Sequence, residues 1–106
     1  RNVGVVNNVA EKQGGGLWVQ TGQAVNIVNS TFSSNRVIND AGGAMFLNTG
    51  STAPVNIVNS TLVHNVAGRA NGALWMNGGN KDSITLRNSI VAFNTAGDRN
   101  QNQVGY

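Results

Sequence analysis

An internal repeat of about 30 residues constrains this 106-residue chain more than any other feature of its sequence. One box of the repeat ends on asparagine and occurs three times, as VNIVNSTFSSN at 25–35, VNIVNSTLVHN at 55–65 and ITLRNSIVAFN at 84–94. A shorter box precedes each copy, as GGLWVQ at 15–20, GAMFLN at 43–48 and GALWMN at 72–77. Self-similarity at a fixed period indicates an architecture in which neighbouring units stack. We therefore expect about three full turns, approximately at 9–35, 36–65 and 66–94, with a partial turn at each end.

Each repeat contains three short segments with the pattern of β-strands, which in the first repeat lie at 17–20, 25–28 and 31–34. Apolar and polar residues alternate with period two, as in Val25-Asn26-Ile27, and this favours strands over helices. The connections are too short to hold a crossover helix, and crossovers between parallel strands are nearly always right-handed. The sequence therefore predicts an all-β fold, a right-handed parallel β-helix with three sheets. The chain, 1–106, is then a single β-helix segment, and we expect it to be part of a longer solenoid.

Stacking also explains the 18 asparagines of the chain. Equivalent positions in adjacent turns of such a fold lie about 4.8 Å apart, so that identical side chains sit above one another. An Asn amide has two donors and an acceptor, and can bond to the copy above and to the copy below. The repeat places seven asparagines in two inward-facing ladder rows: Asn8, Asn35, Asn65 and Asn94 in one, and Asn29, Asn59 and Asn88 in the other.

Two motifs that resemble functional sites have a structural explanation. Asn29-Ser30-Thr31 and Asn59-Ser60-Thr61 match the glycosylation sequon, but the register points both asparagines inward, and we assign them to the ladder. His64 is the only histidine and lies in the third strand of its turn without a second titratable partner nearby. A lone histidine of this kind indicates a surface residue, not a catalytic or metal-binding one.

Trp18, Phe46 and Trp75 occupy one position in three successive turns. If Leu17 and Val19 point into the core, the three aromatic residues project outward as a stripe; the opposite register buries them. In either register the first sheet is apolar on both faces, a pattern typical of sheets that are covered on both sides. A loop, a flanking segment or a neighbouring chain would then cover the stripe. Alternatively the stripe is a platform for sugar rings or for the apolar surface of a partner, and we take it as the candidate binding surface.

Composition excludes several classes of function. The seven Lys and Arg residues are scattered along the chain, whereas nucleic-acid binders cluster them, so we expect no nucleic-acid partner. No run of 18 apolar residues exists, and we expect no membrane insertion by this segment. The absence of cysteine excludes disulfides and thiolate metal sites. We expect neither a cofactor nor a metal. The chain begins at Arg1, which suggests a processed product or a piece of a longer polypeptide.

Two carboxylates are the candidates for catalysis. Glu11 and Asp40 follow their ladder asparagines by three and five residues, and therefore lie in corresponding loops of adjacent turns. Glycoside hydrolysis usually needs two carboxyl groups about 5 to 9.5 Å apart. A Ca²⁺ site, which takes several oxygen ligands, is the other functional interpretation of such a pair. The competing interpretation is that both are solvated loop charges, and we favour it because Glu11 lies beside Lys12.

The boxes also resemble those of a known family. GGAMF at 42–46 together with FSSN at 32–35 resembles the GGA and FxxN elements of polymorphic outer-membrane protein repeats. LVHN at 62–65 and VAFN at 91–94 are weaker variants of the second element. The pattern is also similar to β-helix repeats of bacterial surface proteins, and it covers about residues 5–97. The resemblance implies a β-helix and an extracellular or cell-surface location, in adhesins and secreted passengers. The same fold also hosts pectate lyase-like enzymes, whose acidic strand clusters have no counterpart here.

These observations favour a non-catalytic, extracellular or cell-surface β-helix module that acts as a structural stalk, an adhesin or a filament-building unit. The alternative is a carbohydrate-active, pectate lyase-like β-helix that binds or cleaves polysaccharide, with Glu11 and Asp40 as its acids. Unpaired strand edges at the ends of a solenoid invite pairing with other chains. We therefore expect self-association or continuation of the solenoid through the open ends, and a polysaccharide or a host surface as ligand.

Overall fold

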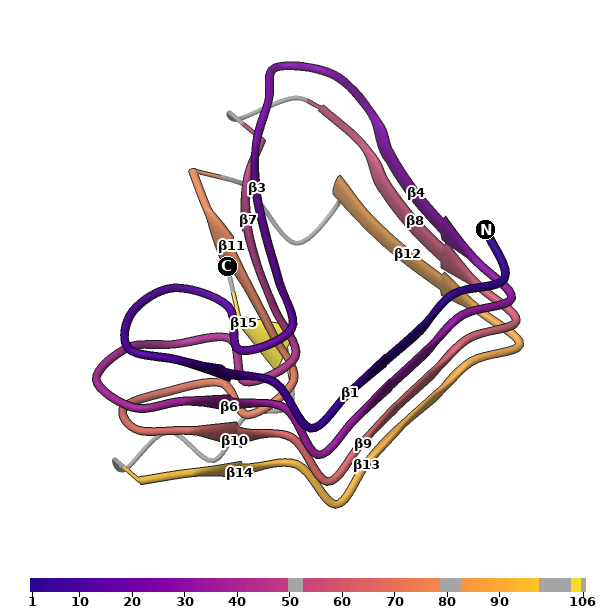
Figure 1. Ribbon diagram of the computed structural model, residues 1–106. Helices are drawn as coiled ribbons and strands as arrows, with labels where there is room; N and C mark the ends of the chain where they lie inside the picture. The colour runs from indigo at the N-terminus through magenta and orange to yellow at the C-terminus, as the bar shows by residue number, and fades with distance from the viewer. Residues whose placement is uncertain (50–52, 79–82, 98–103, 106) are drawn as a thin grey trace.

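The computed structural model describes residues 1–49, 53–78, 83–97 and 104–105. In these residues the chain forms fifteen short strands and no α-helix. The strands build four parallel sheets, in which neighbouring strands come from successive repeats. Successive repeats therefore lie one beneath another, as Figure 1 shows. No helix in the described part of the chain is long and apolar enough to cross a membrane.

Three of the sheets are the ones that the repeat predicts. The first sheet contains β3 (Leu17–Gln20), β7 (Met45–Asn48), β11 (Leu74–Asn77) and β15 (Val104–Gly105). The second contains β4 (Val25–Val28), β8 (Val55–Val58) and β12 (Ile84–Arg87). The third contains β1 (Gly4–Val6), β5 (Thr31–Ser33), β9 (Thr61–Val63) and β13 (Ile90–Ala92). Val25 pairs with Val55, and Val55 with Ile84, so the register predicted from the repeated box is confirmed.

A fourth sheet lies where the sequence predicts only a connection. Its strands have two residues each: β2 (Val9–Ala10), β6 (Arg36–Val37), β10 (Val66–Ala67) and β14 (Thr95–Ala96). Strands of two residues are too short to show alternation, and three-sheet periodicity therefore does not reveal them. One residue of each strand from β6 onward packs into a small second core, formed by Val37, Ala67 and Ala96.

The main core lies between the first three sheets and consists of the alternating inward residues. Its fully buried members in the middle of the stack are Met45, Leu47, Val55, Ile57, Leu62, Leu74 and Met76. Leu86, which pairs with the core residue Ile57, is 43% exposed. The reason is its position on β12, which is the last strand in the order of the second sheet.

The predicted column of asparagines is present, with Asn35, Asn65 and Asn94 buried and Asn8 exposed at its end. The Nδ2 groups of Asn8, Asn35 and Asn65 donate to Oδ1 of the next copy at 3.0, 3.0 and 2.8 Å. Each of these oxygens also accepts the backbone N–H of the preceding copy, for example that of Asn35 at Asn65, at 3.0 Å. Asn65 further donates to the carbonyl oxygen of Phe32 at 3.0 Å. The column thus satisfies buried amides of the backbone as well as its own.

The second inward row consists of serine, not asparagine, and the prediction for Asn29, Asn59 and Asn88 is wrong. These asparagines are exposed and have φ values of 50°, 50° and 47°, in the left-handed region that Asn tolerates. The left-handed residue bends the chain from the second sheet into the third and interrupts the strict alternation, so that the following serine points inward. Ser60 Oγ accepts the N–H of Ser30, and Ser89 Oγ accepts that of Ser60, both at 3.1 Å.

A glycine allows the chain to return from the fourth sheet to the first. In Figure 1 the connections after β6 and β10 project away from the sheets before they turn back. The chain re-enters at Gly43, where a Cβ atom would overlap the carbonyl oxygen of Gly72 and lie 2.7 Å from the backbone nitrogen of Val66. Only glycine allows backbones to approach so closely. The projecting connections are therefore held beside the outer face of the first sheet.

Candidate functional site

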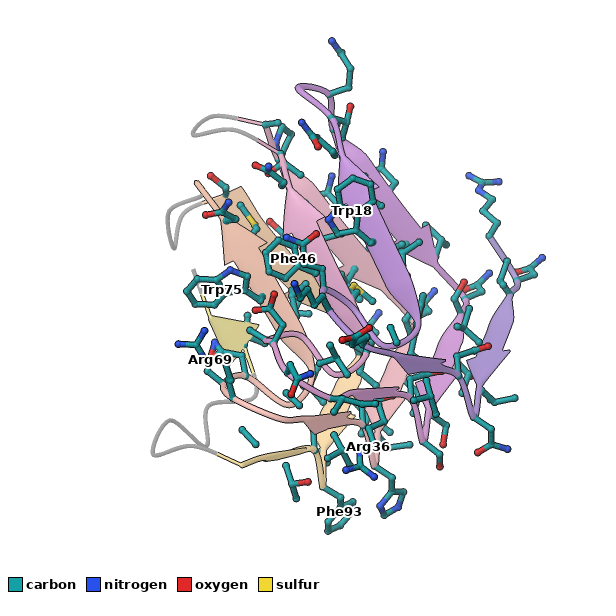
Figure 2. The ribbon with its side chains drawn as sticks, turned by 60° about the vertical axis from the view of Figure 1, so that its left-hand side comes forward. Trp18, Arg36, Phe46, Arg69, Trp75 and Phe93 are labelled. Atoms are coloured by element: carbon teal, nitrogen blue, oxygen red, sulfur yellow. The ribbon has the colours of Figure 1, made fainter. Side chains whose placement is uncertain are left out.

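The aromatic residues form an outward row on the first sheet. Trp18 pairs with Phe46, and Phe46 with Trp75. Their strand neighbours Leu17 and Val19 pack against the core, which leaves the aromatic side chains on the opposite face. Figure 2 shows the three rings following one another down this face. Of the two registers left open by the sequence, the structure has the one with the aromatic residues outside.

The three aromatic side chains differ in accessibility. Trp18 is 49% exposed, Phe46 only 6%, and Trp75 is half-buried. Phe46 lies on the middle strand of the three, in register between Trp18 and Trp75, and it lines one pocket together with Asp40 and Ala41 of the connection that precedes its strand. The row is therefore two accessible indoles separated by a buried phenyl ring, and not a continuous exposed stripe.

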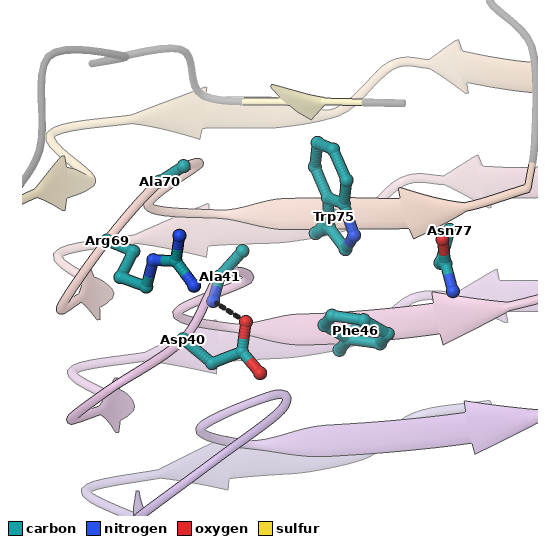
Figure 3. Close-up of a pocket in the computed structure, with 7 residues that line it drawn as sticks. All are labelled: Asp40, Ala41, Phe46, Arg69, Ala70, Trp75 and Asn77. Carbon is teal, nitrogen blue, oxygen red and sulfur yellow. Dashed lines mark hydrogen bonds between the residues drawn. The ribbon is translucent and has the colours of Figure 1, made fainter.

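A pocket of about 300 Å³ adjoins the row. Phe46, Trp75 and Asn77 supply its wall from the first sheet, and the projecting connections supply Asp40, Ala41, Arg69 and Ala70. Figure 3 shows Asp40 and Arg69 at one end, Asn77 at the other, and the two rings between them. The connections are held together by backbone bonds, from Arg69 N to Asp40 O at 3.2 Å and from Gly42 N to Asn71 O at 3.0 Å. The pocket is thus fixed by backbone pairing between adjacent coils.

The polar side chains of the pocket are largely unengaged. Asp40 Oδ1 accepts the N–H of Ala41 at 2.8 Å, which orients the carboxylate. Within the described residues, the Arg69 guanidinium and the Asn77 amide make no side-chain hydrogen bond, and Arg69 forms no ion pair with Asp40. The pocket therefore offers an acceptor, a cationic donor group and an amide to a ligand.

The structure does not bring the two predicted carboxylates into one site. Asp40 lines the pocket, whereas Glu11 is exposed and is not among the lining residues. The backbone oxygen of Glu11 accepts the N–H of Asn39 at 3.0 Å, so its loop runs beside the residue before Asp40. The other two acidic residues of the sequence, Asp82 and Asp98, lie outside the described residues. Within those residues there is no group of three or more potential metal ligands.

Arg69 is a pocket residue that the pattern of carboxylates does not predict, although the sequence carries a signal for it. Asp40 and Arg69 each precede the close-approach glycine of their coil, Gly43 or Gly72, by three residues, and each is followed by alanine. They are thus equivalent positions of opposite charge in adjacent coils. Asn77 lies two residues beyond Trp75 on the same strand and therefore faces the same side of the sheet.

His64 lies away from the pocket, at the corner between the third and fourth sheets. Its ring stacks on that of Phe93, with centroids 5.3 Å apart and planes inclined by 11°. Both residues have a φ of 56°, and Phe93 is 74% exposed. The prediction of a surface position for His64 is confirmed.

Known proteins provide no further guide to this site. Comparison with protein-family models, with curated proteins and with solved structures finds no match for the chain.

Proposed function

We propose that this chain is a non-catalytic module of an extracellular or cell-surface right-handed parallel β-helix, in which stacked coils hold an aromatic contact face outward. The observation that carries the proposal is the combination of outward Trp18 and Trp75 with the adjoining pocket. Indoles with one accessible apolar face are enriched where proteins meet partners. The family resemblance supports the location.

The interior of the fold supports a role as a rigid support. The asparagine column and the serine row bond each coil to the next, and none of the described buried side-chain nitrogen or oxygen atoms lacks a partner. A fully satisfied polar network stiffens and specifies a single arrangement. The contact face is thus presented in one fixed geometry.

The pocket chemistry supports binding without turnover. Hydrolysis of a glycosidic bond usually needs two carboxyl groups on opposite sides of the bond, and among the described residues only Asp40 contributes one to the pocket. The presence of a carboxylate beside two aromatic rings favours a second candidate, the carbohydrate-active β-helix. The two candidates differ in whether a product is formed.

Binding without product formation is the expected result when the protein is incubated with polysaccharides and with fixed host-cell surfaces. The double variant Trp18→Ala/Trp75→Ala should lose at least about tenfold in affinity, because truncation of a central aromatic anchor commonly costs 2 kcal/mol or more. Phe93→Ala, which removes an exposed aromatic ring at another corner, is the matched control and should bind normally. New reducing ends or unsaturated products that disappear in Asp40→Asn would establish the enzyme instead.

The proposed partners include further copies of the chain at the ends of the stack. Val25 and Ile27 in an outer coil are partly exposed, whereas their equivalents Val55 and Ile57 are fully buried, and Leu86 is 43% exposed at the other end. Exposed core residues beside unpaired strand edges favour pairing with another coil.

Concentration-dependent association is therefore expected in sedimentation equilibrium. Leu86→Arg should weaken it, because a charge on the apolar end face opposes burial. Thr85→Arg is the control. It adds the same charge to the same strand, but the side chain of Thr85 points to the opposite face of the sheet from that of Leu86. A protein that sediments as a monomer at millimolar concentration would contradict this part of the proposal.

A further inference from the structure

We infer that the pocket between the projecting connections and the first sheet binds one uncharged pyranose ring, as part of a glycan. The inference rests on the proposed contact function and specifies its ligand. It depends on the size of the pocket, on its aromatic walls and on the balance of charge between Asp40 and Arg69.

The dimensions of the pocket fit a single ring. Its volume of about 300 Å³ lies at the lower end of the range typical of small-molecule sites, about 300 to 1,000 Å³. Its walls include the Phe46 ring and the half-buried Trp75 indole. A pyranose presents C–H groups on its faces and hydroxyl groups around its edge. Aromatic walls with polar groups at the margins match that division.

The polar groups are placed where the ring edge would lie. In Figure 3, Arg69 and Asp40 lie at one end of the pocket and Asn77 at the other, with the two aromatic rings between them. One Asp40 oxygen is held by the Ala41 N–H at 2.8 Å, which leaves the second oxygen to accept from a sugar hydroxyl. The Arg69 guanidinium can only donate hydrogen bonds, whereas the Asn77 amide can donate and accept them. The hydroxyl groups of a sugar can each donate and accept a hydrogen bond, and they therefore suit a pocket that offers both acceptors and donors.

The charges select an uncharged sugar. Asp40 and Arg69 carry opposite charges in one pocket and are not paired with each other within the described residues. Asp40 and Arg69 lie at the same end of the pocket, so a sugar carboxylate paired with Arg69 would also lie near the Asp40 carboxylate, and a sugar ammonium paired with Asp40 would also lie near Arg69. Like charges on neighbouring groups repel. A neutral hexose uses both groups without that cost.

The two tryptophans allow a direct test by NMR. In ¹⁵N-labelled protein the indole N–H resonance of Trp75 reports on the pocket, and that of Trp18, which does not line it, is the internal control. Methyl glycosides of glucose, galactose, mannose and N-acetylglucosamine should be titrated, with glucuronic and galacturonic acids as charged probes. At least one neutral glycoside should shift the Trp75 resonance to saturation and leave Trp18 unchanged.

Variants separate the role of each charged group. Arg69→Gln should weaken that neutral glycoside about tenfold, because hydrogen bonds to a charged group contribute about 1.5 kcal/mol or more. Asp40→Asn retains the acceptor for the Ala41 N–H and should weaken the glycoside several-fold. Arg36→Gln, on the fourth sheet and outside the pocket, is the control and should bind like the parent protein. An unchanged dispersion of the amide spectrum shows that each variant is folded.

Other outcomes overturn the inference. Preferential binding of uronic acids that becomes stronger in Asp40→Asn would identify an anion site. If no saccharide shifts the Trp75 resonance while tryptophan-dependent binding to surfaces persists, the pocket inference fails and the contact function stands. If surface binding is also absent, the proposed function itself fails.

Discussion

Replacement of Asn65 by aspartate is expected to lower the free energy of unfolding by about 4 kcal/mol at pH 7, although the two side chains have nearly the same shape. The Asn65 amide is fully buried and donates to Phe32 O and Asn94 Oδ1 at 3.0 and 2.8 Å. A carboxylate would set a charge and two acceptors against those oxygens. Urea denaturation followed by circular dichroism measures the loss.

The loss of unfolding free energy in Asn65→Asp, relative to the parent protein, should become smaller as the pH falls. Burial among carbonyl oxygens raises the pKa of the new carboxyl group in the folded protein above its unfolded value of about 3.9. The folded state then binds more protons than the unfolded state between the two pKa values, so stability falls as the pH rises through that window. The deficit relative to the parent protein should therefore be smaller at pH 4 than at pH 7.

Asn59→Asp is the matched control for this prediction. Asn59, like Asn65, recurs at one position in each repeat. It is exposed in a left-handed turn, and aspartate tolerates that conformation. Its stability should lie within about 0.5 kcal/mol of the parent protein. Equal effects of the two substitutions would contradict the inward orientation of the asparagine column.

A single methyl group at Gly43 is expected to cost about 3 kcal/mol, the upper part of the range for overpacking. The added Cβ would overlap the Gly72 carbonyl oxygen and lie 2.7 and 2.8 Å from two backbone atoms of Val66. All three contacts are backbone atoms of the next coil, which move only if the coils separate. Thermal or urea unfolding of Gly43→Ala measures the effect.

Gly22→Ala provides the comparison, because a Cβ at Gly22 has no atom within 4 Å. That variant should unfold with a free energy close to that of the parent protein. If Gly43→Ala were equally stable, the close return of the chain from the fourth sheet to the first would be wrong, and with it the wall of the pocket.

The parts of the fold that follow from sequence are those fixed by repetition. Copies of one box can stack in register in only one way if their apolar residues are to share a core, which is why Val25, Val55 and Ile84 pair as expected. The column through Asn35 and Asn65 follows from the same register.

Other parts depend on backbone angles that a repeat does not encode. Asn29 and Ser30 are adjacent and polar, and only the positive φ of Asn29 decides which of them faces inward. The fourth sheet has strands too short for any periodicity. The pocket depends on two connections that project outward, which the repeat does not predict. The pattern of carboxylates therefore indicates Asp40 but not Arg69, its equivalent in the next coil.

The buried amide column has a direction. In each side-chain bond between Asn8 and Asn94, Nδ2 of the earlier copy donates to Oδ1 of the later copy, so the column is a vectorial chain of dipoles. Two molecules that met through like ends would set these dipoles against each other, whereas head-to-tail contact continues them. The proposed end-to-end association would therefore be polar, and it would yield an open filament in preference to a closed twofold dimer.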